Sequence, residues 1–412
     1  MEKAILVGLD IGHDEFFIET MEELKNLSKA CNVEVLGSLI QKKEKPTPNY
    51  FIGEGKVQEL KEMIDLYDAN VVIFNDELSP SHIRNLEQKL EIKVIDRTVL
   101  ILDIFARRAK TKEAMLQVEL AQSQYMLPRV VGMYKSLSRQ KSGTGSKGPG
   151  EQQLELDRRV LRDRISHLKN ELKELVKVRR TQREKRNRST IKTVSLAGYT
   201  NSGKSTLMNT IIDHTLKQDK THTFSEDMLF ATLETKTRKI ELDNNNNFLL
   251  TDTVGFIRKL PHDLIEAFKS TLEEINESSL ILHVIDTANP NFEHQIQTVE
   301  SVLGDLGVKD IPIIYVYNKV DLLDDIPVIS RNNTILISAK NNYNIDRLLV
   351  MINEMLYKNF DVDLLIPFNE SSIYSELKEN AKILETSYLE DGIHVKAKIN
   401  EYYYTKYKNY IN

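Results

Sequence analysis

The sequence predicts an α/β protein: an N-terminal α/β domain with a helical hairpin, a P-loop domain with a mostly parallel sheet, and a small C-terminal α+β domain. Three observations support this fold class. Short β-type runs alternate with helix-length segments through about the first hundred residues. Two long polar helical stretches then flank a Gly-rich segment. Finally, the motif GYTNSGKS follows a β-type run and opens a helical one.

Composition and charge are those of an ordinary folded protein. The 412 residues are 41% hydrophobic and 28% charged, and the net charge of -5 argues against a uniformly basic nucleic-acid coat. Cys31 is the only cysteine, which excludes an intrachain disulfide and a cysteine metal cluster. The N-terminus lacks the long apolar core of a signal peptide, and no run approaches the ~18 apolar residues of a membrane span. We expect a cytoplasmic protein without a transmembrane segment.

The first part of the chain has the pattern of parallel β-α units. The β-type runs are AILVGLD, VEVLGSLI, VVIFND and IKVID. Amphipathic, helix-length segments at 15–30, 55–68 and 81–90 separate them. The sequence therefore predicts a small α/β domain at 1–97.

A long helical hairpin is expected at 98–190. Its first helix is predicted from about Thr98 to a break at Pro128, and its second helix is predicted to open at Glu151. The intervening segment KSGTGSKGPG at 141–150 is too rich in Gly and Ser for regular structure. It is either a plain linker or a mobile, basic finger that reaches for phosphates, and the sequence supports both interpretations equally.

The end of the second predicted helix is strongly basic. Between 177 and 192 the many Lys and Arg residues are opposed only by Glu184. Such a run is often a solvated helix face, but its density on an acidic protein indicates contact with RNA or phosphate at least as strongly.

The motif GYTNSGKS predicts phosphate binding. Gly198, four further residues, Gly203, Lys204 and Ser205 form the P-loop pattern in its strand-loop-helix context. The two glycines let backbone amides converge on phosphate oxygens, and the start of the helix adds its dipole. We expect Lys204 to neutralise the β- and γ-phosphates and the Ser205 hydroxyl to ligate Mg²⁺.

Polar residues after two later β-type runs indicate guanine recognition. Asn318, Lys319 and Asp321 follow the run IPIIYVY. We expect the Asp321 carboxylate to accept hydrogen bonds from the guanine N1-H and 2-amino groups, Asn318 to hold the neighbouring loop, and Lys319 to lie against the base plane. The Ser-Ala-Lys turn at 338–340 offers backbone amides for the guanine carbonyl. Their order behind a P-loop predicts GTP rather than ATP.

Two further segments are expected to sense the γ-phosphate. Asp252 ends the apolar run NFLLTD and is expected to hold the magnesium shell, while the Gly255 amide is expected to bond the γ-phosphate. Thr232 is the preferred second Mg²⁺ hydroxyl, but spacing alone leaves that choice open. The same stretch also contains Thr221, Thr223, Thr235 and Thr237.

Further segments spread along the chain have distinctive sequences. They are NYFIGEGKVQEL, ELAQSQYMLPRVVGM, GSKGPGEQQLELDRRVLRDRI, GYTNSGKSTLMN, LFATLETKTR, DTVGFIRKLPHDLIEAFKSTLEE and LILHVIDTANP, and they span roughly residues 50–358. Together they resemble the signatures of the HflX family, which are ribosome-associated, translation-factor-class P-loop GTPases. Two departures, Lys147 where an arginine is common and EQQLELDRR in place of ETQLETDRR, keep the charge and amide content, so we expect binding to survive them.

The resemblance implies a P-loop GTPase domain at 191–358 that uses Mg²⁺, with Thr232 as the magnesium threonine. It implies catalytic roles for Lys204, Thr232 and Gly255, and Mg²⁺ ligation by Ser205 and Thr232. The implied GTP-binding residues are Gly198, Tyr199, Thr200, Asn201, Ser202, Gly203, Lys204, Ser205, Phe230, Ala231, Thr232, Leu233, Glu234, Asp252, Thr253, Val254, Gly255, Asn318, Lys319, Val320, Asp321, Ser338, Ala339 and Lys340.

The family resemblance also implies partners and a cellular task. It implies binding to the large ribosomal subunit and its RNA and GTP-dependent dissociation of ribosomes, often under stress. We expect a monomer without a DNA partner. The same motifs also fit two other functions: a nucleotide-switched, RNA-binding regulator that recruits another factor, and ATP-driven RNA remodelling.

Phe256 stands directly after the Asp-x-x-Gly motif, where related hydrolases often carry a glutamine. A phenylalanine cannot orient the attacking water, so we expect slow GTP hydrolysis until the ribosome supplies the missing geometry. The alternative is that Phe256 merely packs under the P-loop.

The C-terminal segment at 359–412 matches no motif. Its stretch AKILETSYLEDGIHVKAKIN alternates in polarity around an Asp-Gly pair, which predicts a β-hairpin within a small α+β domain. A role as a packing module is preferred over a second binding surface.

Overall fold

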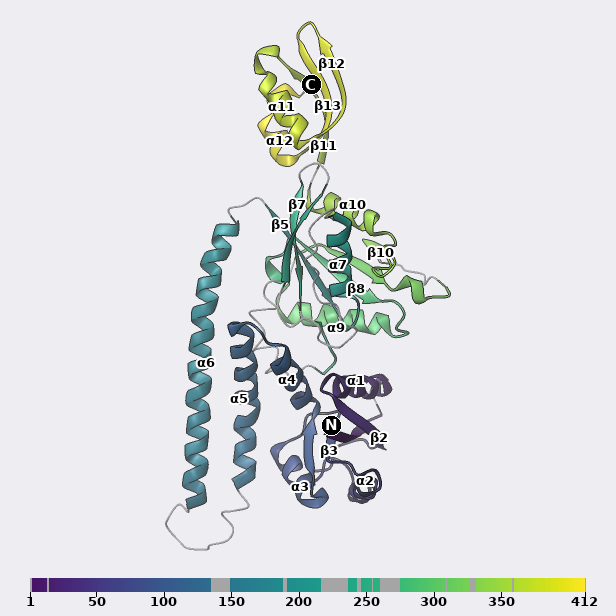
Figure 1. The fold of residues 1–412 in the computed structure, drawn as a ribbon, viewed down its shortest axis with the longest axis vertical. Coiled ribbons are helices and arrows are strands. Elements are labelled where there is room, and N and C mark those ends of the chain that lie inside the picture. Colours follow the sequence, from purple (N-terminus) through teal and green to yellow (C-terminus); the bar gives the residue numbers. More distant parts are fainter. Residues whose placement is uncertain are drawn as a thin grey trace. The chain divides into compact units, whose positions relative to one another are not determined.

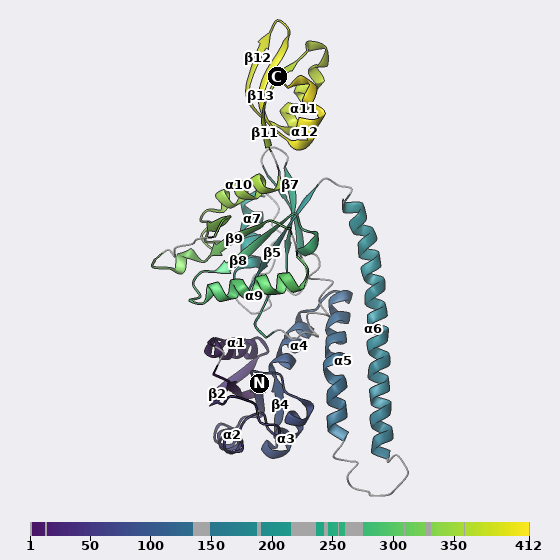
Figure 2. The same ribbon diagram turned by 180° about the vertical axis from the view of Figure 1, so that it is seen from behind.

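A computed structural model describes residues 2–12, 15–134, 149–187, 191–215, 236–242, 246–253, 255–259, 275–308, 310–325, 331–357 and 359–411. They form two compact units (Figures 1 and 2). The first unit contains the described residues up to Glu184 together with residues 255–259, and the second contains the other described residues. The predicted α/β fold class is confirmed, while the division into four parts remains a proposal. In the described part of the chain, no helix has the length and apolar character needed to cross a membrane.

The first unit begins with a four-stranded sheet of order β2-β1-β3-β4, parallel throughout. Its strands are β1 (Glu2–Asp10), β2 (Val33–Lys42), β3 (Val71–Phe74) and β4 (Lys93–Asp96). The connecting helices are α1 (Phe17–Ala30), α2 (Glu54–Tyr67) and α3 (Pro80–Leu90), and α4 (Arg97–Arg108) follows β4. The predicted β-α units are therefore present at the predicted places.

The two faces of this sheet are covered by different helices. Ile5, Val7 and Leu9 of β1 belong to a core that includes buried side chains of α2 and α3. On the other face α1 approaches closely, because a Cβ at Gly8 would lie 2.5 Å from Met21 Sδ. A glycine at this position therefore allows α1 to pack directly on the strand.

The first helix of the predicted hairpin is broken. The sequence predicts one helix from about Thr98 to Pro128, but α4 ends at Arg108 and α5 (Lys112–Tyr134) starts afresh. The Thr111 hydroxyl accepts a hydrogen bond from the Ala114 amide at 3.2 Å, which caps the start of α5 and explains the break.

The predicted break at Pro128 is also wrong, because α5 continues through it. One turn earlier, the Tyr125 carbonyl accepts a hydrogen bond from the Arg129 guanidinium at 2.8 Å. This bond adds a side-chain donor to the turn around Pro128, although the carbonyl that loses its backbone donor at the proline is that of Gln124.

The second helix of the hairpin is confirmed, with an earlier start than predicted. Helix α6 (Pro149–Asn187) begins two residues before Glu151, so Pro149 and Gly150 belong to the helix and not to the predicted loop. Proline is favoured in the first turn of a helix, where its missing N-H is not needed. The rest of that loop lies outside the described residues. Figure 1 shows α5 and α6 side by side, and buried Leu116 and Leu120 of α5 pack with Leu168 of α6.

The second unit contains a six-stranded sheet of order β10-β9-β8-β5-β7-β6. Only β6 is antiparallel to its neighbour, so the sheet is mostly parallel as predicted. The strands are β5 (Lys192–Gly198), β6 (Lys236–Glu241), β7 (Asn247–Asp252), β8 (Leu280–Asp286), β9 (Ile313–Asn318) and β10 (Thr334–Leu336). The helices that pack on it are α7 (Lys204–Thr215), α9 (Phe292–Asp305) and α10 (Ile345–Leu356).

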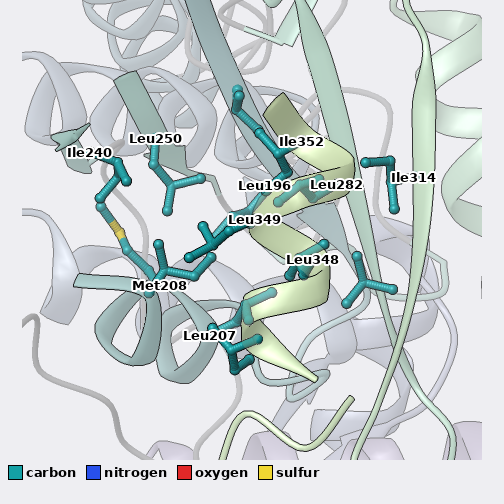
Figure 3. Packing of buried hydrophobic residues seen from close by; sticks show 14 of the residues in the cluster. Leu196, Leu207, Met208, Ile240, Leu250, Leu282, Ile314, Leu348, Leu349 and Ile352 are labelled. Atoms are coloured by element: carbon teal, nitrogen blue, oxygen red, sulfur yellow. The ribbon is translucent and has the colours of Figure 1, made fainter. Parts of the chain in front are cut away.

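Alternation along the central strands builds a core on each face of this sheet. Ile314 and Val316 of β9 join Leu207 of α7 and Leu348 of α10 on one face (Figure 3). Tyr317, on the opposite side of β9, packs with buried Ile296 of α9. Because both faces are covered, the strands read as nearly continuous apolar runs and end in polar residues only at the edge of the sheet.

The C-terminal part of the second unit is a three-stranded antiparallel sheet of order β11-β13-β12. Its elements are β11 (Asn359–Ile366), α11 (Ser371–Asn380), β12 (Lys382–Leu389), β13 (Gly392–Asn400) and α12 (Glu401–Lys406). The hairpin predicted around the Asp-Gly pair is confirmed as β12 and β13. One face of the sheet is apolar and packs with Leu377 and Tyr407. The other face carries the cross-strand ion pairs Lys396–Glu385, Lys398–Asp361 and His394–Asp363, as is usual for a face turned to water.

Shortening Leu168 to alanine is expected to loosen the α5–α6 pair. Leu168 is fully buried between the two helices, so the Leu168→Ala change should lower their local opening free energy by about 2–4 kcal/mol. Amide hydrogen exchange of α5 and α6 measures this energy. The control is Val160→Ala, because Val160 is 64% exposed on the same helix and should change the energy by less than about 0.5 kcal/mol. Equal hydrogen-exchange protection in the two variants would contradict the packing of Leu168 between α5 and α6.

Candidate nucleotide-binding site

Most of the predicted site residues that the structure describes lie at the carboxyl ends of neighbouring strands in the six-stranded sheet. Gly198 ends β5, Asp252 ends β7 and Asn318 ends β9, while the turn at 338–340 follows β10. Carboxyl ends of parallel strands meet at one edge of a sheet, which is the usual ligand site of open α/β folds.

The two P-loop glycines have backbone positions that no other residue fits. Gly198 has φ +153° and Gly203 has φ +92°. A Cβ at Gly198 would lie 2.3 Å from the Val284 carbonyl oxygen, and one at Gly203 would lie 2.3 Å from Asn318 Nδ2. The glycines therefore keep the loop close to the ends of β8 and β9 as well as free to turn.

Lys204 is buried and bends back over the loop. Its ammonium donates to the carbonyl oxygens of Gly198 at 3.1 Å and Tyr199 at 2.7 Å. Burial lowers the pKa of Lys204 to about 8, and the nearby Asp252 carboxylate opposes this with a smaller effect. A phosphate at this position would stabilise the charged ammonium, so the site favours an anion.

Two buried hydroxyls of the loop support the same conclusion. Among the residues that the structure describes, Thr200 Oγ1 and Ser202 Oγ are shielded from solvent and find no hydrogen-bond partner. Buried hydroxyls are normally satisfied, so this pair in the loop fits a polar ligand. Asn201, between them, is exposed and has the left-handed φ of +62°.

The oxygen atoms of Ser205 and Asp252 fit a Mg²⁺ ion that is shared with phosphate. The Ser205 hydroxyl donates to Asp252 Oδ2 at 2.7 Å, and Asp252 is fully buried. Magnesium prefers oxygen ligands and keeps several of its sites for water and phosphate. Across the described ranges, no group of three or more His, Cys, Asp or Glu side chains forms a metal site.

Asn318 ties the P-loop to the turn after β10. Its side-chain nitrogen donates to the Ser202 carbonyl at 3.0 Å, and its side-chain oxygen accepts from the Ala339 amide at 2.9 Å. The hydroxyl of Thr210, in α7, donates to the Ala339 carbonyl at 2.8 Å and holds the same turn. Asn318 thus takes the loop-holding role that the sequence analysis assigned to it.

Asp321 and Ser338 form the edge of the candidate base site. The Ser338 hydroxyl donates to Asp321 Oδ1 at 2.6 Å and accepts from the Asn341 amide at 3.1 Å. This arrangement orients the carboxylate while the Asp321 residue stays exposed. Val320 is half-buried, with its amide bonded to the Ile337 carbonyl at 3.3 Å, and Lys340 is exposed.

Two residues that the sequence analysis did not single out join this loop. Asp286, at the end of β8, accepts from the Lys319 ammonium at 2.8 Å, and Thr287 donates its hydroxyl to the Asn318 carbonyl at 2.7 Å. Their signal in the sequence is the polar pair that ends the apolar run LILHVIDT, on a strand next to the one that ends in Asn318.

The predicted switch residues are only partly described. Phe230, Ala231, Thr232, Leu233, Glu234 and Val254 lie outside the described residues, so the magnesium role of Thr232 stays a prediction. Thr253 is buried, and its hydroxyl donates to the Leu196 carbonyl at 2.6 Å, away from solvent. Gly255 is buried and belongs to the first unit.

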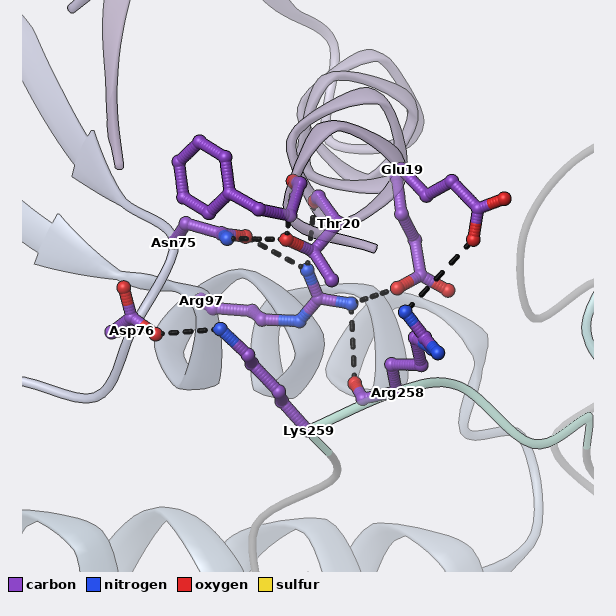
Figure 4. A network of polar contacts seen from close by, with 9 residues as sticks. Glu19, Thr20, Asn75, Asp76, Arg97, Arg258 and Lys259 are labelled. Carbon is purple, nitrogen blue, oxygen red and sulfur yellow. Dashed lines mark hydrogen bonds and ion pairs between the residues drawn. The ribbon is translucent and has the colours of Figure 1, made fainter. Parts of the chain in front are cut away.

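The segment that follows Gly255 is anchored to the N-terminal sheet (Figure 4). The buried Arg97 guanidinium donates to the Arg258 carbonyl at 3.2 Å, and Lys259 pairs with Asp76 at 2.7 Å. Arg97 also donates to Asn75 Oδ1 at 3.0 Å and pairs with Glu23.

Arg258 adds its own side chain to this contact. Its guanidinium lies 4.2 Å from the centre of the Phe16 ring and 3.9 Å from Glu19. The residues directly after the Asp-x-x-Gly motif are therefore held by several groups at the carboxyl edge of a different sheet.

Phe256 is buried, with 2% of its surface exposed. It is not a member of the core that packs α7 and α10 on the six-stranded sheet, and it groups with the first unit. Its side chain is therefore shielded from water. This burial is compatible both with a role in slowing GTP hydrolysis and with packing alone.

Family models match almost the whole first three-quarters of the chain. Residues 18–106 match the GTP-binding GTPase N-terminal model, residues 108–186 the GTP-binding GTPase Middle Region, and residues 193–319 the 50S ribosome-binding GTPase model. The C-terminal sheet lies beyond these matches.

Relatives with known family membership match most or all of the chain. The chain is 47% identical to the GTPase HflX of Caldanaerobacter subterraneus subsp. tengcongensis, over 100% of this chain and 94% of the relative. It is 43% identical to the GTPase HflX of Escherichia coli, over 86% of this chain and 83% of the relative. A GTP-binding protein of Sulfolobus solfataricus, solved in complex with GDP, is 27% identical over 86% of this chain and 99% of that one, with a TM-score of 0.45.

A methyl group on Gly203 is expected to disrupt the candidate site. The Gly203→Ala change places a Cβ at 2.3 Å from Asn318 Nδ2 at a left-handed φ, so GDP affinity should fall roughly tenfold to a hundredfold. Titration with fluorescent GDP measures the change. The control is Gly304→Ala in α9, where a Cβ meets nothing within 4 Å and binding should be unaltered. Equal affinities would show that the glycine contact does not constrain the loop.

Proposed function

Because the chain belongs to the HflX family of GTP hydrolases, we propose that it binds the large ribosomal subunit and dissociates ribosomes in a GTP-dependent manner, as a response to stress. The description of the matching family model, a 50S ribosome-binding GTPase, supports the choice of partner. The proposed site of action is the cytoplasm, and the proposed active form is a monomer.

The residues at the edge of the six-stranded sheet bind GTP in this proposal. The P-loop amides and Lys204 hold the β- and γ-phosphates, and Asp321 recognises the guanine edge. Ser205, with Thr232, would ligate a Mg²⁺ ion, which neutralises developing charge on the phosphates when it is bound. The 2.7 Å contact between Ser205 and Asp252 supports this assignment, because it gathers two oxygen groups at the phosphate end of the loop.

The observation that carries GTP dependence is the anchoring of residues 258 and 259. They follow Asp252 closely in the chain, and Arg97 and Asp76 of the N-terminal unit hold them. The chain therefore passes within a few residues from the motif proposed to sense the γ-phosphate to a segment held by Arg97 and Asp76. This supports a protein whose ribosome-facing parts respond to the nucleotide, since a ligand shifts a structure only through contacts that differ between states.

Exposed basic side chains on α6 supply candidate contacts to ribosomal RNA. Arg159, Arg162, Lys169 and Lys173 are exposed along the helix. The helix continues to Asn187 through much of the predicted basic run, whose side chains beyond Lys177 lie outside the description. Phosphate contacts of this kind make association strongly dependent on salt.

Phe256 fits an enzyme that hydrolyses GTP slowly until it contacts the ribosome. Phosphoryl transfer relies on positioning, and the buried ring supplies no polar group to align the attacking water. We propose that contact with the ribosome supplies this geometry. The energy for separating the subunits would come from tighter binding of the GTP form, with hydrolysis permitting release.

A rival function uses the same groups. A nucleotide-switched RNA-binding regulator that recruits another factor would need the same switch and the same basic helix, but would leave intact ribosomes unless that factor is present. ATP-driven RNA remodelling is disfavoured because the Asp321 carboxylate can accept from the N1-H and 2-amino groups of guanine, and adenine has neither donor.

GTP turnover is expected to be low for the protein alone and to rise about tenfold or more with large ribosomal subunits. The stimulation should fall between about 50 and about 200 mM salt, because the contacts are to phosphates. Phe256→Gln should raise the basal rate, whereas Phe368→Gln, at a side chain that is 53% exposed, should not. A high basal rate of GTP hydrolysis in the unaltered protein, or a rate that large subunits do not change, would overturn the proposal that the ribosome completes the active site.

Ribosome splitting by purified protein is expected with GTP and much less with GDP. Sucrose-gradient sedimentation of intact ribosomes measures the loss of the joined particle, and Lys204→Ala, which lacks the phosphate-binding ammonium, is the matched nucleotide-defective variant. Equal splitting with GDP would contradict the proposed energy source. Splitting that requires a third protein would favour the recruiting regulator.

A further inference from the structure

Asp286 is built into the base-recognition loop although it belongs to a different strand. Its Oδ2 atom accepts from the Lys319 ammonium at 2.8 Å, and its Oδ1 atom accepts from the Ala288 amide at 3.2 Å. Both carboxylate oxygens are thus engaged, and the second contact fixes the rotation of the carboxylate. The pairing of β8 with β9 places Asp286 directly beside Asn318, so the sheet itself sets the distance.

Lys319 has a conformation that needs such support. Its φ of +68° and ψ of +30° lie in the left-handed region, which a lysine rarely adopts. Conformations of this kind persist where the surroundings hold them, and they cluster at ligand-binding positions. The backbone on each side is held as well. Thr287 donates to the Asn318 carbonyl through its amide at 3.0 Å and its hydroxyl at 2.7 Å, and the Val320 amide donates to the Ile337 carbonyl at 3.3 Å.

The Lys319–Asp286 ion pair is partly buried, and part of its surface stays accessible to a ligand. The side chains of Lys319 and Asp286 are 23% and 19% exposed. A partly exposed ion pair contributes little to folding stability. Its main effect here is to keep the long and flexible lysine side chain in one place before the nucleotide arrives, which reduces the ordering cost of binding.

We propose that Asp286 is a positioning residue for guanine nucleotides: it fixes Lys319 so that the lysine stem lies along the face of the purine ring while Asp321 recognises its edge. The inference rests on the proposed function, because it takes the Asn318-to-Asp321 loop as the base site. Face and edge contacts differ in what they recognise. A lysine stem packs equally on guanine and hypoxanthine, whereas the Asp321 carboxylate distinguishes them through the 2-amino group.

The test compares the affinities of GDP, inosine diphosphate and xanthosine diphosphate for the full chain. Asp286→Asn is expected to weaken GDP and inosine diphosphate by the same factor, about tenfold, and to speed their dissociation. Asp321→Asn is expected to change the preference among the three bases. Asp305→Asn removes a charge from an exposed position of α9 and should leave all affinities unchanged. Asp286→Glu, which keeps the carboxylate, should recover part of the lost affinity.

A double variant shows whether Asp286 acts through Lys319. Adding Asp286→Asn to Lys319→Met should cause no further loss, because the ammonium that Asp286 holds is already gone. Fully additive losses, or unchanged GDP binding by a folded Asp286→Asn variant, would overturn the inference alone. If Asp321→Asn leaves the base preference unchanged, that result contradicts the proposed base site and therefore also the inference that rests on it. If Asp286→Asn unfolds the nucleotide-free protein, failure of Asp286→Glu to bind better than Lys319→Met overturns it.

Discussion

The buried side-chain amide of Asn318 holds together the parts of the candidate site. Its nitrogen and oxygen bond the P-loop and the turn after β10, and both bonds run to backbone atoms. Because an amide side chain offers a donor and an acceptor on one rigid plane, the two loops cannot shift independently. Gly203 completes this constraint, since only a residue without a Cβ lets the P-loop come so close to Asn318. The candidate phosphate and base sites are thus linked through one buried residue.

A second linkage runs from the segment after the Asp-x-x-Gly motif to the N-terminal sheet. Arg97 is almost completely buried, and a buried guanidinium is costly unless its donors are satisfied. It meets Glu23, Asn75 and the carbonyls of Thr20 and Arg258, so part of its hydrogen-bonding capacity depends on the segment from the GTPase region. The carboxyl edge of this parallel sheet, where α/β folds usually bind a ligand, receives a piece of the same chain.

Local signals predicted most elements of the fold but not every boundary. The β-α alternation, the second hairpin helix and the C-terminal hairpin follow from periodicity and turn residues that act over a few positions. The long helix expected from Thr98 to Pro128 was wrong at both points. Thr111 caps the start of a new helix after α4 has ended at Arg108, and Arg129 supplies a side-chain hydrogen bond beside the proline. These contacts compete with propensity and leave little trace in the apolar pattern.

The sequence by itself predicted the P-loop, the candidate guanine motif and the family, because each depends on residue types at fixed spacings within short segments. Tertiary structure alone decided which residues support that chemistry. Asp286 pairs with Lys319 only because β8 lies beside β9, and Arg97 meets Arg258 only because residues separated by 161 positions fold together. Partners that are distant in sequence carry no spacing signal, so their roles depend on the packing of strands and helices.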